Sequence, residues 1–306
     1  MDTQRFEQIV ARISTVVLGK EPQIRLALTC LFAGGHLLIE DRPGIGKTTL
    51  AKVLAKCLGL TFQRVQFTSD MLPGDILGVS IYDQNSGSFY FHPGPIFTQV
   101  LLVDEINRAM PKTQSALLEA MEEGQVTIEG ETRDLIPPFF VIATQNPLEY
   151  AGTFPLPESQ MDRFLMRITV GYPDRGAEKD IIRGGGTQKA LAGIKPCMTE
   201  DDVIDVQEKV GTVHLSDSFL EYLQNIIAYT RNAPHFHIGL SPRAGIALAM
   251  AARSWAFIQG RTYAVPEDLK KVLFQVAGHR LRSGSDRMEI PEPRLMSLFS
   301  EVPVPV

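Results

Sequence analysis

A glycine-rich turn between an apolar run and a helix-forming run constrains the fold of this chain more than any other feature. The apolar run HLLIE covers residues 36–40, the turn DRPGIGKTT covers 41–49, and residues 47–58 are rich in Ala, Leu and Lys. These patterns predict a short strand and a helix that the turn joins. Backbone N–H groups of such a turn converge on phosphate oxygens, and the helix start adds the positive end of its dipole. The turn therefore predicts a phosphate-binding loop.

The residue types in this loop predict ATP and Mg²⁺ as cofactors. Lys47 is expected to reach the β- and γ-phosphates, and Thr48 is expected to hold Mg²⁺. The common pattern has glycine where this chain has Asp41. Asp tolerates unusual backbone angles better than most residues, so the turn can form, but its carboxylate could weaken nucleotide binding. The full set of expected phosphate-binding residues is Asp41, Arg42, Pro43, Gly44, Ile45, Gly46, Lys47, Thr48 and Thr49.

Strand and helix patterns alternate through the first half of the chain. Strands are predicted at residues 36–40, 61–67, 99–104, 139–144 and 165–170, and helices at 21–33, 47–58 and 112–123. This rhythm favours an α/β fold in which a parallel sheet has helices on both faces. Two hairpins, at 79–91 and 125–136, are expected to interrupt it.

The second half of the chain is predicted to be helical. Glycines at 184–186 mark a connector, and later helices are expected to begin after the capping residues Thr199, Ser216 and Ser241 and at Pro266. The predicted organisation is an α/β nucleotide-binding domain at 1–182, a linker at 183–198 and a small all-helical lid domain at 199–306. Residues 290–306 contain four prolines and are assigned no structure.

Polar residues at two strand ends predict a catalytic site. Asp104 and Glu105 end an apolar strand, which places their carboxylates at the carboxyl edge of the sheet, where open α/β folds bind ligands. Asp104 is expected to position Mg²⁺ through its water shell and Glu105 to polarise the attacking water. Asn146 follows the next strand and could orient that water; the alternative is a turn asparagine before Pro147.

Two arginines could complete this site. Arg163 could supply charge to the ATP of a neighbouring subunit, as an arginine finger does, and the alternative is a surface salt bridge. Arg243 lies in the first turn of a predicted helix, where a cation opposes the helix dipole and is expected to face an anion. That anion is either nucleotide phosphate or a nearby carboxylate. Arg108 and Lys112, just after the acids, could contact a neighbouring subunit.

Composition argues against several other classes of protein. The net charge is −5, from 30 basic and 35 acidic side chains, and no basic stripe favours nucleic-acid binding. The three cysteines form no CxxC pair and are expected to be buried thiols, while His235 and His237 lack the partners of a zinc site. The start of the chain does not look like a signal peptide, and the apolar stretch at 26–39 is too short to span a bilayer. A cytoplasmic protein is expected.

These motifs, in this order, resemble those of the AAA+ superfamily of ring-forming ATPases. Several stretches of the sequence also resemble the corresponding stretches of its MoxR family. Those stretches lie at residues 66–73, 94–97, 101–121, 143–147, 154–164 and 241–244, within a resemblance over roughly 17–281. The departures are Asp41 and the run SQM at 159–161, where AQL is commoner. The implied roles are Walker A at 44–49, Walker B at Asp104 and Glu105, sensor 1 at Asn146, the arginine finger at Arg163 and sensor 2 at Arg243.

The resemblance also implies how such a protein works. It implies a hexameric ring with ATP between subunits, hydrolysis of ATP to ADP and phosphate, and chaperone-like remodelling or maturation of client protein complexes, often with a partner that carries a von Willebrand factor A domain. Both hairpins would face the ring axis. There the aromatic side chains of one hairpin could grip a client or pack on their own domain: Tyr82, Phe89, Tyr90 and Phe91.

Three other functions stay open at this stage. A metal-chelatase-type motor subunit would have similar core motifs. An ATP-gated scaffold with little turnover is favoured by Asp41. A ring that remodels DNA is disfavoured by the acidic balance of the chain.

Overall fold

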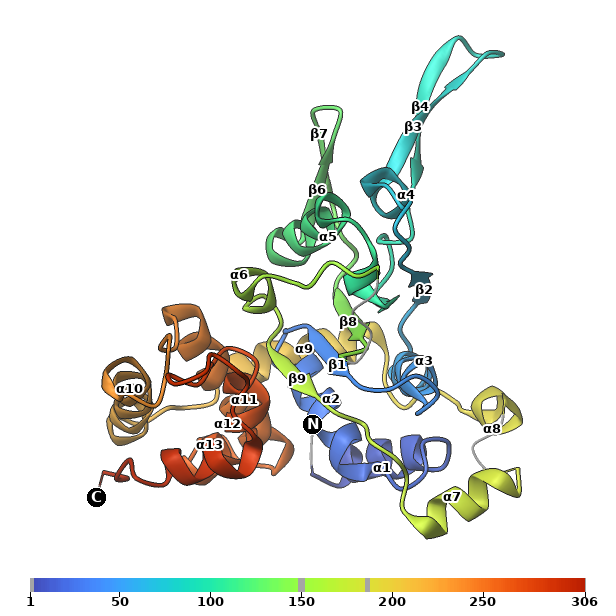
Figure 1. Cartoon of the computed structure of the whole chain (residues 1–306). Coiled ribbons are helices and arrows are strands. Elements are labelled where there is room, and N and C mark those ends of the chain that lie inside the picture. Colours follow the sequence, from blue (N-terminus) through green and yellow to red (C-terminus); the bar gives the residue numbers. More distant parts are fainter. Residues whose placement is uncertain (1–2, 148–151, 185–187, 306) are drawn as a thin grey trace.

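A five-stranded parallel sheet forms the centre of the molecule in the computed structural model, which describes residues 3–147, 152–184 and 188–305 (Figure 1). The strand order is β2-β5-β8-β1-β9. The strands are β1 (Leu37–Glu40), β2 (Phe62–Gln66), β5 (Val100–Asp104), β8 (Phe140–Gln145) and β9 (Met166–Ile168). All five predicted strands are therefore present, and the predicted parallel sheet is confirmed. Parallel pairing puts every carboxyl end at the same edge.

The inner strands are apolar throughout because the sheet is covered on both faces. Every residue of β5 is buried, and so are Leu37, Leu38 and Ile39 of β1. The edge strand β2 instead has exposed residues at two of its first three positions. Continuous burial is the usual pattern of parallel strands between two helical layers.

Helices from the first half of the chain pack against the sheet or against the helices that cover it. They include α1 (Thr3–Ser14), α2 (Glu21–Phe32), α3 (Lys47–Cys57) and α5 (Pro111–Glu123). The polar start of the chain, to which the sequence assigned no element, forms α1. This helix buries Phe6, Ile9, Val10 and Ile13, whose spacing makes one face of a helix. It packs on α2 and α3 and so supports the helix that follows the glycine-rich loop.

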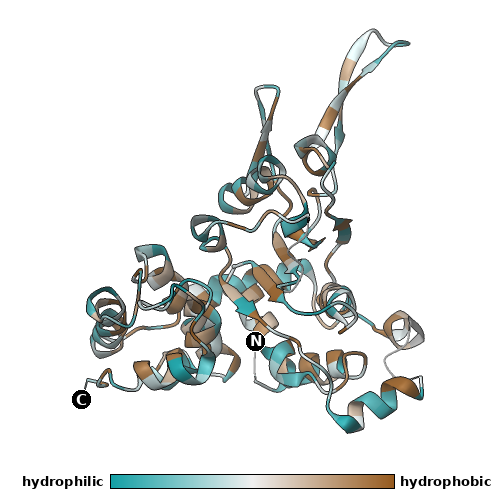
Figure 2. Ribbon diagram, in the orientation of Figure 1, coloured by the Kyte–Doolittle hydropathy of each residue, from teal (hydrophilic) through white to brown (hydrophobic). Residues whose placement is uncertain are grey.

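Both predicted hairpins are present and antiparallel, and they project from the same side of the molecule (Figure 1). The first follows α4 (Pro73–Leu77) and pairs β3 (Gly78–Asp83) with β4 (Ser88–Pro93); the second pairs β6 (Gln125–Ile128) with β7 (Glu131–Asp134). Figure 2 shows hydrophobic bands on the first hairpin, far from the body of the molecule.

The aromatic residues of the first hairpin divide into two groups. Phe91 lies under the guanidinium of Arg133, 4.1 Å from its ring centroid, and so packs against the second hairpin. Tyr82 and Phe89 pair across the strands with ring centroids 5.1 Å apart, yet Phe89 is 70% exposed. Tyr90 is exposed as well. Packing on its own domain therefore explains the position of Phe91, whereas Tyr82, Phe89 and Tyr90 are left exposed.

The second half of the chain is helical, as predicted. Its elements are α6 (Glu158–Met161), α7 (Arg175–Ile182), α8 (Gln188–Gly193), α9 (Glu200–Gly211), α10 (Asp217–Asn232), α11 (Pro242–Ile258), α12 (Pro266–Ala277) and α13 (Glu292–Phe299). The side chains of Thr199, Ser216 and Ser241 each accept a backbone N–H at a helix start, which confirms them as caps. The short helix α13 lies in the tail left unassigned, and its Phe299 stacks on Phe236 with ring centroids 6.2 Å apart.

One apolar core runs from the helices beneath the sheet into the helical second half. It joins residues of α1, α2 and α3 to residues of α9, α11 and α12. Ser254 of α11 donates a buried hydrogen bond of 2.8 Å to the carbonyl of Thr29 in α2. The division into domains at residues 183–198 stays a prediction, and residues 185–187 of the expected glycine connector lie outside the described residues.

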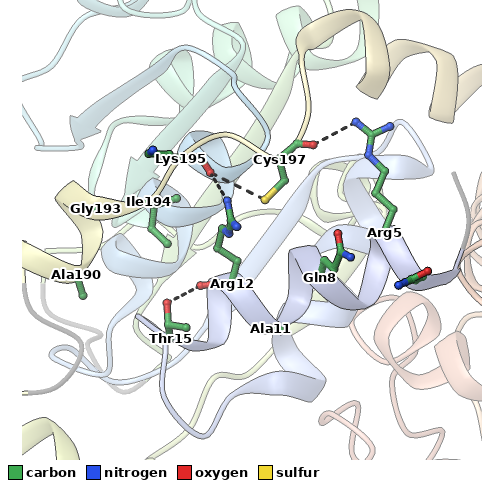
Figure 3. A pocket seen from close by; sticks show the side chains of 11 residues that line it. Arg5, Gln8, Ala11, Arg12, Thr15, Ala190, Gly193, Ile194, Lys195 and Cys197 are labelled. Atoms are coloured by element: carbon green, nitrogen blue, oxygen red, sulfur yellow. Dashed lines mark hydrogen bonds between the residues drawn. The ribbon is translucent and has the colours of Figure 1, made fainter.

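Two of the three free cysteines, Cys57 and Cys197, meet where α3 ends, and Figure 3 shows Cys197 at the edge of the groove next to this contact. The Sγ atoms of Cys57 and Cys197 are 3.3 Å apart, and the N–H of Cys197 donates to the carbonyl of Cys57 at 2.7 Å. Cys30 and Cys57 are buried as expected, whereas Cys197 is partly exposed in a groove beside Arg12 and Lys195.

This contact gives a test of how α3 packs on the segment before α9. Treatment with diamide is expected to join Cys57 and Cys197, because a small rotation of either side chain closes the distance to about 2.05 Å. Intact mass and peptide mapping would detect the loss of two hydrogens. Cys30→Ser should leave the reaction unchanged, and Cys57→Ser should abolish it. Three free thiols after prolonged treatment of the wild type would contradict this packing.

Candidate active site

The glycine-rich loop spans residues 41–46, from the end of β1 to the first residue of α3. Gly44 and Gly46 have φ values of 85° and 92°, which residues with a side chain rarely adopt. A Cβ atom at either position would meet nothing within 4 Å, so the backbone angle is what requires glycine there. The loop therefore has the conformation that turns its backbone toward the start of α3.

Lys47 lies among the acids that the sequence places at the strand ends. Its Nζ donates to the carbonyl of Asp41 at 2.6 Å. Burial lowers the pKa of Lys47, and the negative charges of Asp41, Asp104 and Glu105 act against that shift. The structure thus brings the loop lysine and the two predicted catalytic acids together at one edge of the sheet.

The carboxylate of Asp41 is engaged by backbone groups. Its Oδ2 accepts the N–H of Gly171 at 2.5 Å, and its Oδ1 accepts the N–H of Arg42 at 2.8 Å. Its own N–H donates to the carbonyl of Gln145 at 3.2 Å. These bonds fasten the loop to β8 and to the segment after β9, so Asp41 has a structural task at the position where glycine is common.

Asp104 and Glu105 are fixed by neighbours on adjacent strands. Asp104 is 7% exposed; its carboxylate accepts Nε of Arg64 at 2.6 Å and the hydroxyl of Thr144 at 3.2 Å. Glu105 has a φ of 57°, and its N–H donates to the same hydroxyl at 3.0 Å. The side chain of Glu105 accepts Nε2 of Gln66 at 2.7 Å. Thr144 therefore sets the relative positions of both acids.

Sequence patterns did not single out Arg64, Gln66 or Thr144 as site residues. Gln66 pairs in register with Asp104, so the strand order, once known, would have pointed to it. Arg108, expected to contact a neighbouring subunit, has its Nε 3.0 Å from a carboxylate oxygen of Glu105 in the same chain. Asn146 follows β8, between β5 and β1 in the sheet, and so lies at the same edge as the loop and the acids.

The two predicted arginines lie together but at the other end of β1. Nε of Arg163 is 3.0 Å from Oε2 of Glu122, and Nη2 of Arg243 bonds Oε1 of the same carboxylate. Both border a cavity of about 230 Å³ whose lining includes residues 33–36, which precede β1. The loop follows β1, whose four residues span about 13 Å. Neither arginine is therefore brought to the loop of its own chain.

This sheet, with a glycine loop after β1, two acids ending β5 and a helical bundle beyond, defines an ATPase of the AAA+ class. A family model described as "ATPase family associated with various cellular activities (AAA)" matches residues 36–166, and one described as "AAA lid domain" matches 228–296. The chain belongs to the MoxR family of AAA+ ATPases and is an ATP-hydrolysing enzyme.

Similarity over most of the chain supports this assignment. It is 37% identical to Chaperone MoxR1 of Mycobacterium tuberculosis, over 92% of this chain and 76% of that protein. It is 46% identical to YeaC of Bacillus subtilis, described as uncharacterized, over 89% of this chain and 85% of that protein. A crystal structure from Cytophaga hutchinsonii, described as a presumed ATPase, has a TM-score of 0.90 and 35% identity and covers 98% of this chain and 94% of that one.

No helix within residues 3–147, 152–184 and 188–305 is both long enough and apolar enough to cross a bilayer.

The bonds of Asp41 predict the effect of removing its carboxylate. Asp41→Ala should lower the free energy of unfolding by about 1–3 kcal/mol, because a charged acceptor of two backbone N–H groups is lost. It should also weaken nucleotide binding, since the loop loses its anchor to Gly171. Urea unfolding and titration with a fluorescent ATP analogue would measure both.

Glu119→Ala provides a matched control for this variant, because Glu119 is an exposed acid away from the loop. Tighter nucleotide binding by Asp41→Ala, at unchanged stability, would instead support repulsion between Asp41 and the phosphates.

Proposed function

We propose that this ATPase hydrolyses ATP to ADP and phosphate at sites shared between neighbouring subunits of a ring, most simply a hexamer, and uses the reaction to remodel or mature client proteins. The observation that carries the proposal is the separation within one chain. The loop and both acids lie beyond the carboxyl end of β1, while Arg163 and Arg243 lie at its amino end. A second copy of the chain that presents its arginines to the ATP of the first copy would complete the catalytic site.

The oxygen donors at the carboxyl edge fit a magnesium ion. Thr48 offers a hydroxyl in the first turn of α3, and the carboxylate of Asp104 lies close enough to Lys47 to influence its pKa. Mg²⁺ prefers such hard oxygen donors and usually keeps several waters and substrate phosphates as ligands. The ion would neutralise charge on the phosphates.

Each protein group has a defined task in this proposal. Backbone N–H groups of residues 44–48 and the Lys47 ammonium hold the phosphates, and Glu105 accepts a hydrogen bond from the attacking water and polarises it. Asn146 orients that water. Arg163 of the neighbouring copy stabilises the negative charge that grows on the transferred phosphoryl group.

The position of Arg243 bears on which anion it faces. The sequence left open whether that anion is nucleotide phosphate or a nearby carboxylate, and within one chain Arg243 pairs with the carboxylate of Glu122. Arg243 shares Glu122 with Arg163, so the two guanidinium groups would reach the same phosphate, that of the neighbour. We therefore assign Arg243 to the shared site, as a second cation on the neighbour's ATP.

The first hairpin is the proposed contact for a client protein. The hairpin projects away from the sheet (Figure 1), and its Tyr82, Phe89 and Tyr90 are exposed. Exposed aromatic clusters of this kind favour protein contacts. The name of the mycobacterial relative, a chaperone, points to the same function. A partner with a von Willebrand factor A domain belongs to the proposal through the family resemblance.

An ATP-gated scaffold with little turnover is the second candidate function, and Asp41 was the reason for considering it. The hydrogen bonds from Gly171 and Arg42 hold that carboxylate on the protein, which weakens the case for it. A chelatase-type motor would share the same site and differ in its partner.

Mixing inactive variants tests whether the site is shared. Glu105→Gln and Arg163→Ala should each lose most of the ATPase rate. A one-to-one mixture should recover activity at about a quarter of the interfaces, where an intact Glu105 meets an intact Arg163 from the other variant. The rate per subunit should also rise with protein concentration. A mixture as inactive as its components would contradict a shared site.

Substitution of the hairpin aromatics tests the client contact. Reduced, carboxymethylated α-lactalbumin, a permanently unfolded protein, is expected to stimulate the ATPase of the wild type. Phe89→Ser with Tyr90→Ser should reduce that stimulation about tenfold, since two exposed aromatic contacts are lost, and leave the basal rate unchanged. Ser86→Ala at the hairpin tip is the control. Full stimulation of the double variant would exclude these aromatics as the contact.

A further inference from the structure

We propose that Glu122 is a positioning residue that occupies the two arginines in place of the neighbour's ATP, so that the shared site forms only when a bound triphosphate displaces this carboxylate. The inference rests on the proposed function, since it concerns how the arginines are made available to the neighbouring subunit.

Glu122 joins three parts of the chain that are distant in sequence. It lies in the last turn of α5, Arg163 follows α6, and Arg243 is in the first turn of α11. Each carboxylate oxygen takes one guanidinium, so both predicted phosphate-binding cations point at a single anion. A carboxylate with two guanidinium partners mimics the charge pattern that a phosphate oxygen pair would present.

Glu122 is the counterion of Arg163 and Arg243, because the other acid near them is paired elsewhere. Asp162 borders the same cavity, but it accepts Nε of Arg280 at 2.6 Å and the hydroxyl of Ser241 at 3.0 Å. Arg280 is 5% exposed and also donates to the carbonyl of Phe164, so it is a fixed internal cation. The charges on the cavity lining are therefore three arginines against two acids.

Solvent exposure distinguishes the two ion pairs of Glu122 from the ion pair between Asp162 and Arg280. The side chains of Arg163, Arg243 and Glu122 are 27%, 46% and 31% exposed, so solvent and a docking subunit can reach them. Half-exposed ion pairs contribute little to stability and exchange partners readily. A triphosphate offers more negative charge and more acceptor oxygens than one carboxylate, and planar guanidinium groups bind it in a bidentate way. The exchange therefore favours ATP once the neighbour brings it close.

Arg243 has an additional reason to need this anion. A cation in the first turn of a helix is repelled by the positive end of the helix dipole. Glu122 offsets that repulsion in the isolated subunit, and the phosphate of the neighbour would offset it in the ring. The cation thus exchanges one anion for another and is never left unpaired, which keeps the barrier to assembly low.

Neutralising the carboxylate provides the test. Glu122→Gln keeps the shape and one acceptor oxygen but removes the charge that competes with ATP. The protein concentration that gives half-maximal ATPase rate should fall about fivefold, the gain expected from removing one competing exposed ion pair, with kcat at saturation unchanged. Glu119→Gln, an exposed acid on the same helix, should change neither value.

A second comparison separates competition from a purely structural role. In an Arg163→Ala, Arg243→Ala background, Glu122→Gln should have no effect on ATP-dependent assembly measured by sedimentation, because no cation remains to be released. Raising the salt concentration should reduce the difference between wild type and Glu122→Gln, as screening weakens the competing pair. Thermal unfolding of each variant shows that it is folded.

The outcomes distinguish this inference from the proposed function. An unchanged or higher half-activating concentration for Glu122→Gln, with the mixed variants still complementing, would overturn only the role of Glu122. Failure of the mixed variants to complement would overturn the shared site, and the role of Glu122 with it.

Discussion

The parallel pairing of β1 between β8 and β9 is the constraint on which the rest of the structure depends. It sets Glu40 beside Gln145 in register, so the loop after β1 begins level with the end of β8, and the pairing of β5 with β8 brings the acids to the same edge. Because β1 is fully buried over Leu37 to Ile39, a slip in its register would expose apolar side chains and move the loop away from the acids. One buried strand thereby connects the stability of the core to the geometry of the site.

Charged groups at the site are partnered within the protein. Asp104 lies against Arg64, Glu105 against Gln66, and Glu122 against two arginines. Such pairs keep a highly charged surface from destabilising the subunit, and their partial exposure makes them weak enough to exchange. In the proposed mechanism, phosphate, metal and a neighbouring subunit would take the place of these internal partners.

Local patterns predicted the elements that depend on local physics. The buried runs of β5 and β8, the caps at Thr199, Ser216 and Ser241, and both hairpins were all predicted because burial, capping and turn formation leave a signature within a few residues. The helices α1 and α13 were not predicted. In α1 the apolar residues Phe6, Ile9, Val10 and Ile13 are diluted by polar neighbours. In α13 the prolines concealed a helix that begins at Glu292 and tolerates Pro293 in its first turn, where the missing N–H costs no hydrogen bond.

The sequence by itself determined where the glycine loop, the two acids and Asn146 lie relative to the strands, since each is recognised by residue type and by its place after a strand. The tertiary structure alone decided the surroundings of these residues: the bond from Gly171 to Asp41, the hydroxyl of Thr144 between the two acids, and the meeting of Arg163 and Arg243 on Glu122. The reason is that a loop conformation depends on the residues within it, whereas an ion pair between α5 and α11 depends on a distance that only the packing of the whole chain fixes.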